Sequence, residues 1–328
     1  MDKILKELPE AKKNVPLKNY TTYKIGGPAK YFFVAKTLGR SPTGEAKEGL
    51  MLALKVAKEN KLPIFILGGG SNILISDKGL NGLVIKMDIL GSEFNENTVN
   101  VGAGENSTKL AYLLAEHGLF GFEWAAGMPG TVGGAIYGNA QAFGTKISDA
   151  IKSVEAINKK TLEIKSFTKE QCQLSLKNSI FKKNKNFVII SAVLEFKSGD
   201  AEQMKTKIKD FLHHRRTKHP MNFPSAGSVF VNPEKKITNK KLLEKFPELN
   251  EHNEKGIIPA GYLIAKSGLA GRKNGNAQIS EKHANFIINL GGAKAKNVLF
   301  LMKLAEAKVK KNFGISLEKE VQLVGFGK

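Results

Sequence analysis

Residues 124–144 read WAAGMPGTVGGAIYGNAQAFG, and the rest of the chain is interpreted around them. Five glycines between residues 127 and 138, with small residues among them, allow the backbone to turn sharply and to approach another surface closely. Peptide N–H groups exposed by such a bend form a concave anion site, and a pyrophosphate is a common ligand there. A tight structural turn explains one glycine cluster equally well. The choice between the two interpretations therefore depends on a second cluster.

The second glycine cluster directly follows an apolar run. Residues 63–67 read PIFIL and predict a buried strand, and GGGSN follows at 68–72. Free N–H donors and two short polar side chains thus stand at a place suited to a cofactor. The Gly-x-Gly-x-x-Gly fingerprint that opens a helix in doubly wound dinucleotide-binding proteins is absent, which argues against that fold.

Hydrophobic periodicity predicts helices and strands throughout the chain. The predicted helices cover 44–60, 106–117, 201–214 and a last amphipathic segment from about 298 to a stop at Gly314. The predicted strands cover 30–34, 63–67, 73–76, 82–86 and 98–101, three antiparallel runs at 154–156, 162–166 and 187–196, and a final run at 316–324.

Length and charge limit the classes of protein. At 328 residues the chain is long enough for about two domains, and we place their boundary near residues 198–200. The formal net charge of +21 favours anionic partners, although a lysine-rich proteome with solvated faces explains it as well. Because no nucleic-acid-binding motif is found, we expect phosphorylated small molecules and not nucleic acid as partners.

Cysteine and histidine usage bears on the compartment and on metal binding. Cys172 is the only cysteine, which excludes an intrachain disulfide and a thiolate metal site and suits a reducing compartment. None of the histidines has metal-ligand spacing, so we expect no metal. Neither a signal peptide nor a run of the roughly 20 apolar residues of a spanning helix is found, so we expect a cytoplasmic protein without membrane insertion.

Four motifs in this order resemble one family. The two glycine clusters, SAGSVF at 225–230 and LEKEV at 317–321 are similar to the UDP-N-acetylenolpyruvoylglucosamine reductases, the MurB flavoenzymes of bacterial cell-wall synthesis. The resemblance implies an α+β fold with a lead-in at 1–18, a two-lobed FAD-binding region of the PCMH/VAO type at 19–199, and a smaller α+β substrate-binding domain at 200–328. The two lobes are expected at about 19–88 and 89–199.

The resemblance also implies the cofactors and the reaction. NADPH reduces non-covalent FAD and leaves, and the flavin then delivers hydride to the enolpyruvyl double bond of UDP-N-acetylglucosamine enolpyruvate, which gives UDP-N-acetylmuramate. In this family the FAD pyrophosphate lies against loops that match the two clusters. The implied FAD-binding residues are Gly68, Gly69, Gly70, Ser71, Asn72, Gly127, Pro129, Gly130, Thr131, Gly133 and Gly134.

Three residues match catalytic positions of the family. Ser228 matches the proton donor to the enolate that hydride addition produces; without the resemblance, a turn residue is the favoured interpretation. Glu320 matches the residue that helps to stabilise or protonate the enolate, and a solvated carboxylate on an edge strand is its alternative. Lys177 stands where the family has an arginine, so the positive charge is kept and the bidentate fork is lost.

The expected substrate-binding residues are cationic or polar. They are Arg215, Arg216, Lys218, Asn232 and His283. Phosphate contact is the natural role of the cations, although either arginine can instead pair with a surface carboxylate. The chain departs from the family at Leu176, Gln141 and Gln322, where a tyrosine, a glycine and a basic residue are usual. We still expect FAD binding despite these departures. They can change the turnover rate or the exact substrate.

Two other functions are compatible with the sequence. One is a flavoenzyme of the same fold that oxidises a small alcohol; many of these tether flavin through His or Cys near the glycine loops, and neither 68–72 nor 127–144 contains such a residue. The other is a basic nucleic-acid-binding protein or a degenerate flavin-fold scaffold, whose binding to DNA would be salt-dependent and sequence-blind. We expect the reductase, acting as a monomer.

Overall fold

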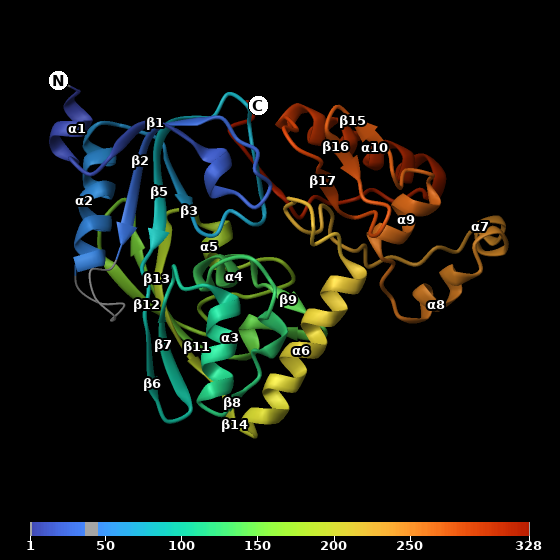
Figure 1. The fold of residues 1–328 in the computed structure, drawn as a ribbon, viewed down its shortest axis with the longest axis horizontal. Coiled ribbons are helices and arrows are strands. Elements are labelled where there is room, and N and C mark those ends of the chain that lie inside the picture. The colour runs from blue at the N-terminus through green and yellow to red at the C-terminus, as the bar shows by residue number, and fades with distance from the viewer. Residues whose placement is uncertain (1, 37–44, 328) are drawn as a thin grey trace. The chain divides into compact units, whose positions relative to one another are not determined.

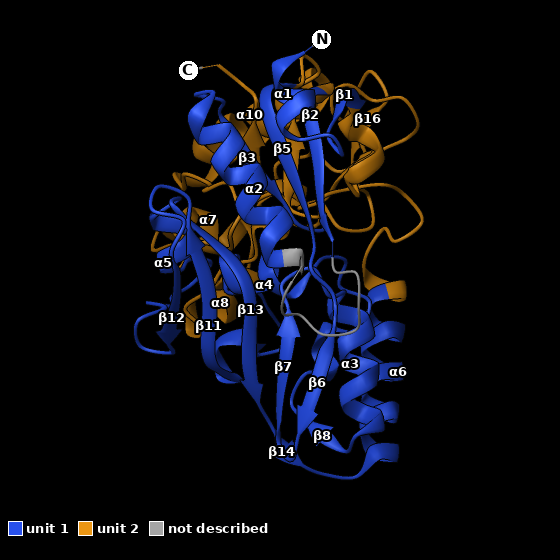
Figure 2. Cartoon of the chain, turned by 90° about the vertical axis from the view of Figure 1, so that its left-hand side faces the viewer, with its two compact units in different colours: residues 1–15, 29–69, 80–215 blue, residues 16–28, 70–79, 216–328 orange. Residues whose placement is uncertain are grey.

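The computed structural model describes residues 2–36 and 45–327 (Figure 1). The chain forms two compact units, coloured separately in Figure 2: unit 1 comprises Met1–Val15, Ala29–Gly69 and Leu80–Arg215, and unit 2 comprises Pro16–Pro28, Gly70–Gly79 and Arg216–Lys328. These units are defined by contact and take short segments from distant parts of the sequence. The domain boundaries predicted at 19, 88 and 199 follow the order of the chain, and they stay predictions.

The first lobe of unit 1 is a four-stranded sheet with the order β1-β2-β5-β3. Its elements are α1 (Lys3–Glu7), β1 (Lys12–Pro16), β2 (Pro28–Lys36), α2 (Glu45–Glu59), β3 (Ile64–Leu67) and β5 (Leu80–Asp88). Strand β5 runs parallel to both β2 and β3. Leu50 and Leu54 of α2 share a buried core with Leu83 and Ile85 of β5. The strand predicted at 63–67 is confirmed, and it ends at the glycine cluster of residues 68–72.

The second lobe of unit 1 is a five-stranded antiparallel sheet with the order β12-β11-β13-β7-β6. Its strands are β6 (Ser92–Asn95), β7 (Thr98–Gly102), β11 (Ile151–Asn158), β12 (Ile164–Thr168) and β13 (Phe187–Glu195), which confirms the three antiparallel runs. Leu110 of α3 (Ser107–Glu116) and Ile136 of α4 (Val132–Gly138) share a core with Leu194 of the sheet. Val188 and Ile190 of β13 instead join the core of the first lobe.

Shorter elements complete unit 1. They are the 3₁₀ helices η2 (Glu123–Ala125) and η3 (Ile147–Asp149), the strands β8 (Leu119–Phe120), β9 (Gln141–Ala142), β10 (Thr145–Lys146) and β14 (Lys197–Ser198), and the helix α5 (Ile180–Lys183). The long helix α6 (Ala201–Lys218) contributes its residues up to Arg215 to this unit.

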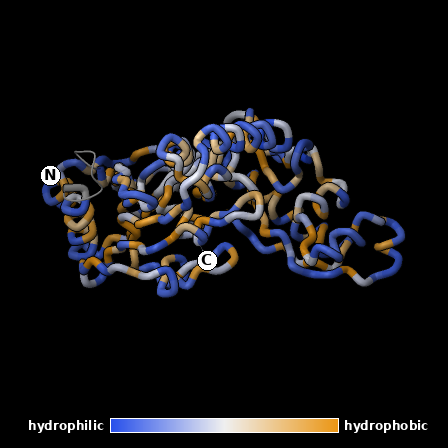
Figure 3. The backbone as a smooth tube through the Cα atoms, turned by 90° about the horizontal axis from the view of Figure 1, so that it is seen from below, coloured by the Kyte–Doolittle hydropathy of each residue, from blue (hydrophilic) through white to orange (hydrophobic). Residues whose placement is uncertain are grey.

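Unit 2 contains a three-stranded antiparallel sheet and a two-stranded parallel one. Its elements are η1 (Leu17–Tyr20), β4 (Ile73–Ile75), α7 (Lys240–Lys245), α8 (Glu248–Glu254), α9 (Ala260–Lys266), β15 (Lys273–Asn274), β16 (Ala277–Ile279), β17 (Ile287–Asn289), α10 (Ala295–Phe313) and β18 (Gln322–Val324). Val298 and Leu301 of α10 pack with Leu263 of α9 in its core. Hydrophobic residues recur along the elements of each unit, as the hydropathy colours in Figure 3 show.

The structure corrects three details of the predicted elements. The glycine-rich stretch contains the helix α4, whose N-cap Thr131 accepts a hydrogen bond from Gly134 N and whose buried Val132 offsets the low helix propensity of glycine. The final strand predicted at 316–324 is wrong over its first part, because only Gln322–Val324 is regular. Helix α6 continues past the predicted end to Lys218. The predicted start of α2 at Gly44 lies outside the described residues.

Candidate active site

The two glycine clusters meet within unit 1. A Cβ atom added at Gly69 would stand 2.6 Å from the Cα atom of Gly130. One added at Gly68 would stand 2.9 Å from the Oγ1 atom of Thr131. Side chains at these positions would push the two backbones apart, so the close approach predicted from the glycine content is confirmed.

Backbone donors are available in the bends and not at the start of α4. No hydrogen bond to another described residue uses the N–H groups of Gly69, Gly130 or Thr131. The N–H of Val132 instead donates to the carbonyl of Glu105 at 2.9 Å, and that of the next residue donates to Ala103 at 2.9 Å. An anion would therefore be bound by the bends themselves.

In unit 2, Ser228 lies on a short segment held from two sides. An isolated bridge pairs Ser228 with Phe286. On the other side, the N–H of Glu320 donates to the carbonyl of Val229 at 2.8 Å. The structure thus brings together the segments that carry two of the predicted catalytic residues, although they are far apart in the sequence.

The end of the glycine cluster at 68–72 joins this group. The Asn72 side-chain amide donates to the carbonyl of Glu320 at 3.3 Å. The Thr22 hydroxyl donates to the carbonyl of Ser225 at 2.7 Å, and the Thr22 N–H donates to the carbonyl of Gly70 at 3.1 Å. Within unit 2, hydrogen bonds therefore connect the cofactor loop to both segments that carry predicted catalytic residues.

Comparisons with known proteins show the family of the chain. The family described as "UDP-N-acetylenolpyruvoylglucosamine reductase, C-terminal domain" matches residues 219–324, and "FAD binding domain" matches 45–164. The UDP-N-acetylenolpyruvoylglucosamine reductase of Alkaliphilus oremlandii is 38% identical over 94% of this chain and 92% of its own length. The chain belongs to the UDP-N-acetylenolpyruvoylglucosamine reductase (MurB) family. It is an FAD-dependent oxidoreductase.

Two further comparisons extend over nearly the whole chain. The reductase of Halalkalibacterium halodurans is 36% identical over 97% of this chain and 96% of its own length. The crystal structure of MurB from Thermus caldophilus has a TM-score of 0.73 and 28% sequence identity, and covers 95% of this chain and 98% of its own. The expected α+β fold class with an FAD-binding region is thus confirmed.

The residues present fit the FAD of the MurB family. Both glycine clusters fall in or beside the segment that matches an FAD-binding domain. The two clusters lie so close together that a side chain at Gly69 would collide with Gly130. The N–H groups of Gly69 and Gly130 make no hydrogen bond to another described residue. Backbone N–H donors that are not covered by side chains are what a bound pyrophosphate requires.

Arg215 is bound to the backbone that precedes the glycine cluster at 127–134. Its side chain is only 8% exposed, and its Nε and Nη2 atoms donate to the carbonyls of Ala126 at 3.0 Å and Trp124 at 2.9 Å. Its guanidinium also lies 5.2 Å from the ring centroid of Phe143. Desolvation by burial lowers the pKa of Arg215 below its usual value. These contacts give Arg215 a role in holding the loop that precedes Gly127.

Lys177 lies on a tight turn attached to the end of α4. Ser175 and Asn178 exchange backbone hydrogen bonds of 3.1 Å, and Lys177 between them has a positive φ of 53°. The amide of Asn139, which caps α4, donates to the carbonyl of Ser175 at 2.9 Å. Helix α4, which begins within the glycine cluster at 127–134, therefore positions the turn that carries Lys177.

The predicted substrate-binding residues of unit 2 differ in environment. Arg216 and Lys218 are exposed at the end of α6. Asn232 accepts a hydrogen bond from the N–H of Ala260 at 3.0 Å, which fixes its side chain. His283 is partly buried, and its ring centroid lies 4.9 Å from that of Phe286, the bridge partner of Ser228. Desolvation by burial lowers the pKa of His283 below its usual 6.5.

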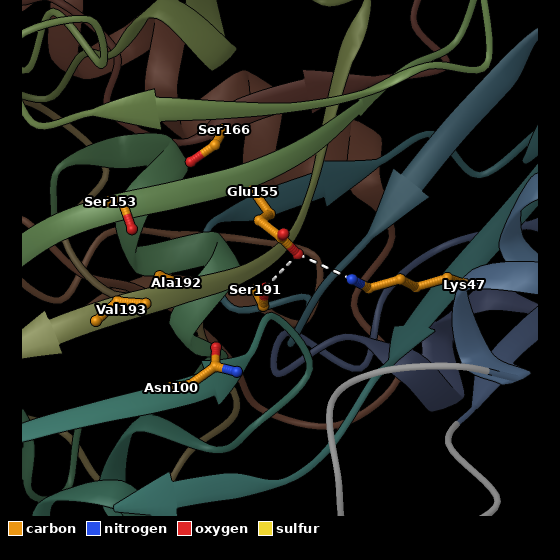
Figure 4. A pocket seen from close by; sticks show the side chains of 8 residues that line it. All are labelled: Lys47, Asn100, Ser153, Glu155, Ser166, Ser191, Ala192 and Val193. Atoms are coloured by element: carbon orange, nitrogen blue, oxygen red, sulfur yellow. Dashed lines mark hydrogen bonds and ion pairs between the residues drawn. The ribbon is translucent and has the colours of Figure 1, made fainter. Parts of the chain in front are cut away.

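A separate polar pocket lies on the five-stranded sheet (Figure 4). Its lining includes Asn100 and Ser153, and the carboxylate of Glu155 accepts hydrogen bonds from Lys47 at 2.9 Å and Ser191 at 3.2 Å. None of the predicted site residues lines it. Because this carboxylate is already paired, the pocket gives no indication of a ligand.

Sequence reasoning missed two residues that hold the site. Asn285 is 2% exposed and binds both backbone groups of Phe230, and Thr22 connects Gly70 with Ser225. Neither lies in a motif that predicts a contact, because their partners are 55 and 203 residues away. No helix in the described part of the chain combines the length and apolar character needed to cross a membrane.

Proposed function

We propose that this enzyme reduces the enolpyruvyl group of UDP-N-acetylglucosamine enolpyruvate to UDP-N-acetylmuramate in peptidoglycan precursor synthesis, with NADPH as electron donor. When bound, FAD accepts a hydride from NADPH and supplies it to the enolpyruvyl double bond. The observation that carries the proposal is the hydrogen-bonded group of Asn72, the Ser228 segment and Glu320 in unit 2, in a chain 38% identical to a reductase of this name.

Ser228 is the proposed proton donor. Hydride addition leaves negative charge beside the substrate carboxylate, and the resulting enolate is basic enough to take a proton from a hydroxyl. The Ser228 hydroxyl is partly exposed and makes no hydrogen bond to another described residue, so its proton is available to a substrate. Its position, fixed by two neighbouring segments, matters more than its acidity.

Glu320 and Lys177 complete the proposed catalytic set. Glu320 is partly buried and is held one hydrogen bond from Val229, beside the proton donor, where it stabilises or helps to protonate the enolate. Lys177 supplies a positive charge for the substrate carboxylate as a point charge, without the paired donors of an arginine.

The remaining cations and amides are proposed to bind the UDP-sugar. Arg216 and Lys218 are exposed and suited to phosphate, and Asn232 and His283 are oriented by their own contacts. For Arg215, the two loop contacts support an effect on the flavin loop as well as on the substrate. We further propose that the enzyme is a cytoplasmic monomer and that it binds no nucleic acid.

Anaerobic half-reactions test the function. The purified protein should be yellow, NADPH should bleach its flavin absorbance, and UDP-N-acetylglucosamine enolpyruvate should then restore it, with UDP-N-acetylmuramate as product. Mild denaturation should release intact FAD, since the predicted loops hold it without a covalent bond. A reduced protein that this substrate fails to reoxidise would contradict the proposal.

A further inference from the structure

The Asn285 side chain replaces a strand partner beside Ser228. Its Oδ1 atom accepts a hydrogen bond from the N–H of Phe230 at 3.0 Å, and its Nδ2 atom donates to the carbonyl of Phe230 at 2.8 Å. The backbone carbonyl of Asn285 also accepts from the N–H of Val229 at 2.8 Å. Asn285 is 2% exposed, so these bonds form away from water, where leaving a partner unsatisfied costs most.

These bonds determine where the Ser228 segment can lie. The residues after Ser228 form no regular strand, and the other side of the segment is held through the Val229 carbonyl by Glu320. Both backbone groups of Phe230 are bound by one amide. Without that amide, the segment keeps the backbone bond from Val229 to Asn285 and the bonds on the side of Glu320, and it loses the pair of bonds that fixes Phe230.

We propose that Asn285 is a positioning residue that fixes the Ser228 hydroxyl for proton donation. This inference rests on the proposed function. Asn285 does not touch the substrate; it acts through the backbone that carries Ser228. Proton donation from a weak acid depends on position, and a displacement of about 1 Å can reduce the rate about a hundredfold. The loss therefore belongs to the sugar half-reaction and not to the reduction of FAD by NADPH.

The main test is a double-mutant cycle measured on both half-reactions. Asn285→Ala should slow reoxidation by the enolpyruvyl substrate about tenfold to a hundredfold and change reduction by NADPH less than about twofold. In a Ser228→Ala background, Asn285→Ala should cause no further loss in the sugar half-reaction, because the group it positions is absent. A residue with a merely structural role would slow both backgrounds alike.

Asn289 provides a matched control in the same unit. It is also 2% exposed, and its amide binds the carbonyl of Tyr23 at 2.9 Å and the N–H groups of Gly291 at 2.9 Å and Ala293 at 3.0 Å. Asn289→Ala removes these three side-chain hydrogen bonds, one more than Asn285→Ala removes, and none of them is to the Ser228 segment. It should lower the melting temperature and leave the ratio of the two half-reaction rates unchanged.

A second variant tests the inference if Asn285→Ala does not fold. Asn285→Asp keeps the size and one acceptor oxygen, but it replaces the donor to the Phe230 carbonyl with an oxygen and adds a buried carboxylate, and the same selective slowing is expected. Equal loss in both half-reactions, additive loss on Ser228→Ala, or selective slowing by Asn289→Ala would overturn the inference. If the unsubstituted enzyme does not reduce the enolpyruvyl substrate, the proposed function fails instead, so the two failures are distinguishable.

Discussion

At the scale of residues, the predicted catalytic groups depend on neighbours that the sequence does not identify. Ser228 was found through the SAGSVF motif, and Glu320 through LEKEV. Their proximity comes from backbone bonds such as that from Glu320 N to Val229 at 2.8 Å, across a separation that local patterns cannot span. Motifs therefore supplied the candidate residues, while the hydrogen bonds of Asn285 and Thr22 required the fold.

His283 gives a prediction on stability and pH. Burial lowers its folded-state pKa below 6.5, so at lower pH the unfolded chain binds more protons than the folded protein. The stability contributed by the neutral ring is therefore complete above about pH 6.5 and is lost as the pH falls through the folded pKa. His283→Gln should flatten the decrease in melting temperature between neutral pH and about pH 5, measured without ligands.

The two melting curves distinguish this account from a general acid effect. Wild type and variant share every other titrating group, so their difference isolates His283. If the variant loses stability on acidification as steeply as the wild type, burial of the neutral ring does not contribute as argued.

At the scale of elements, the sequence predicted that the two glycine clusters form closely packed bends, but it did not predict helix α4 within one of them. Helix α4 was missed because its glycines have low helix propensity, and its stability comes from Thr131 capping and the burial of Val132 and Ile136. The regular part of the last strand shrinks to Gln322–Val324, because only those residues pair with β4. Tertiary contacts decided both cases.

The contact between the clusters predicts an effect on FAD affinity. In Gly69→Ala, the new methyl group meets the backbone of Gly130 at 2.6 Å, so the loops must separate. Overpacking of this kind costs roughly 1–3 kcal/mol, and FAD should bind at least about fivefold more weakly in a fluorescence titration. Gly138→Ala is the matched control, since a Cβ atom there meets nothing within 4 Å. Equal FAD affinity in Gly69→Ala and wild type would refute the role given to this contact.

At the scale of the whole molecule, composition indicated the class of ligand and motifs indicated the family. The net charge of +21 suits NADPH and a UDP-sugar, which are both anionic, but it does not distinguish them from other anions. The order of four motifs led to the MurB family, which identity of 38% over 94% of the chain establishes. The two compact units, with 16–28 and 70–79 grouped with the C-terminal part, could not be foreseen because contact does not follow chain order.

The central claim is that Ser228 completes the reaction after hydride transfer. Stopped-flow absorbance without oxygen, comparing Ser228→Ala with wild type, measures it directly. We predict that NADPH reduces the flavin of the variant within about twofold of the wild-type rate, whereas the enolpyruvyl substrate reoxidises it about 10²–10⁴ times more slowly. Equal slowing of both half-reactions, or an unchanged rate with the sugar, would contradict the account.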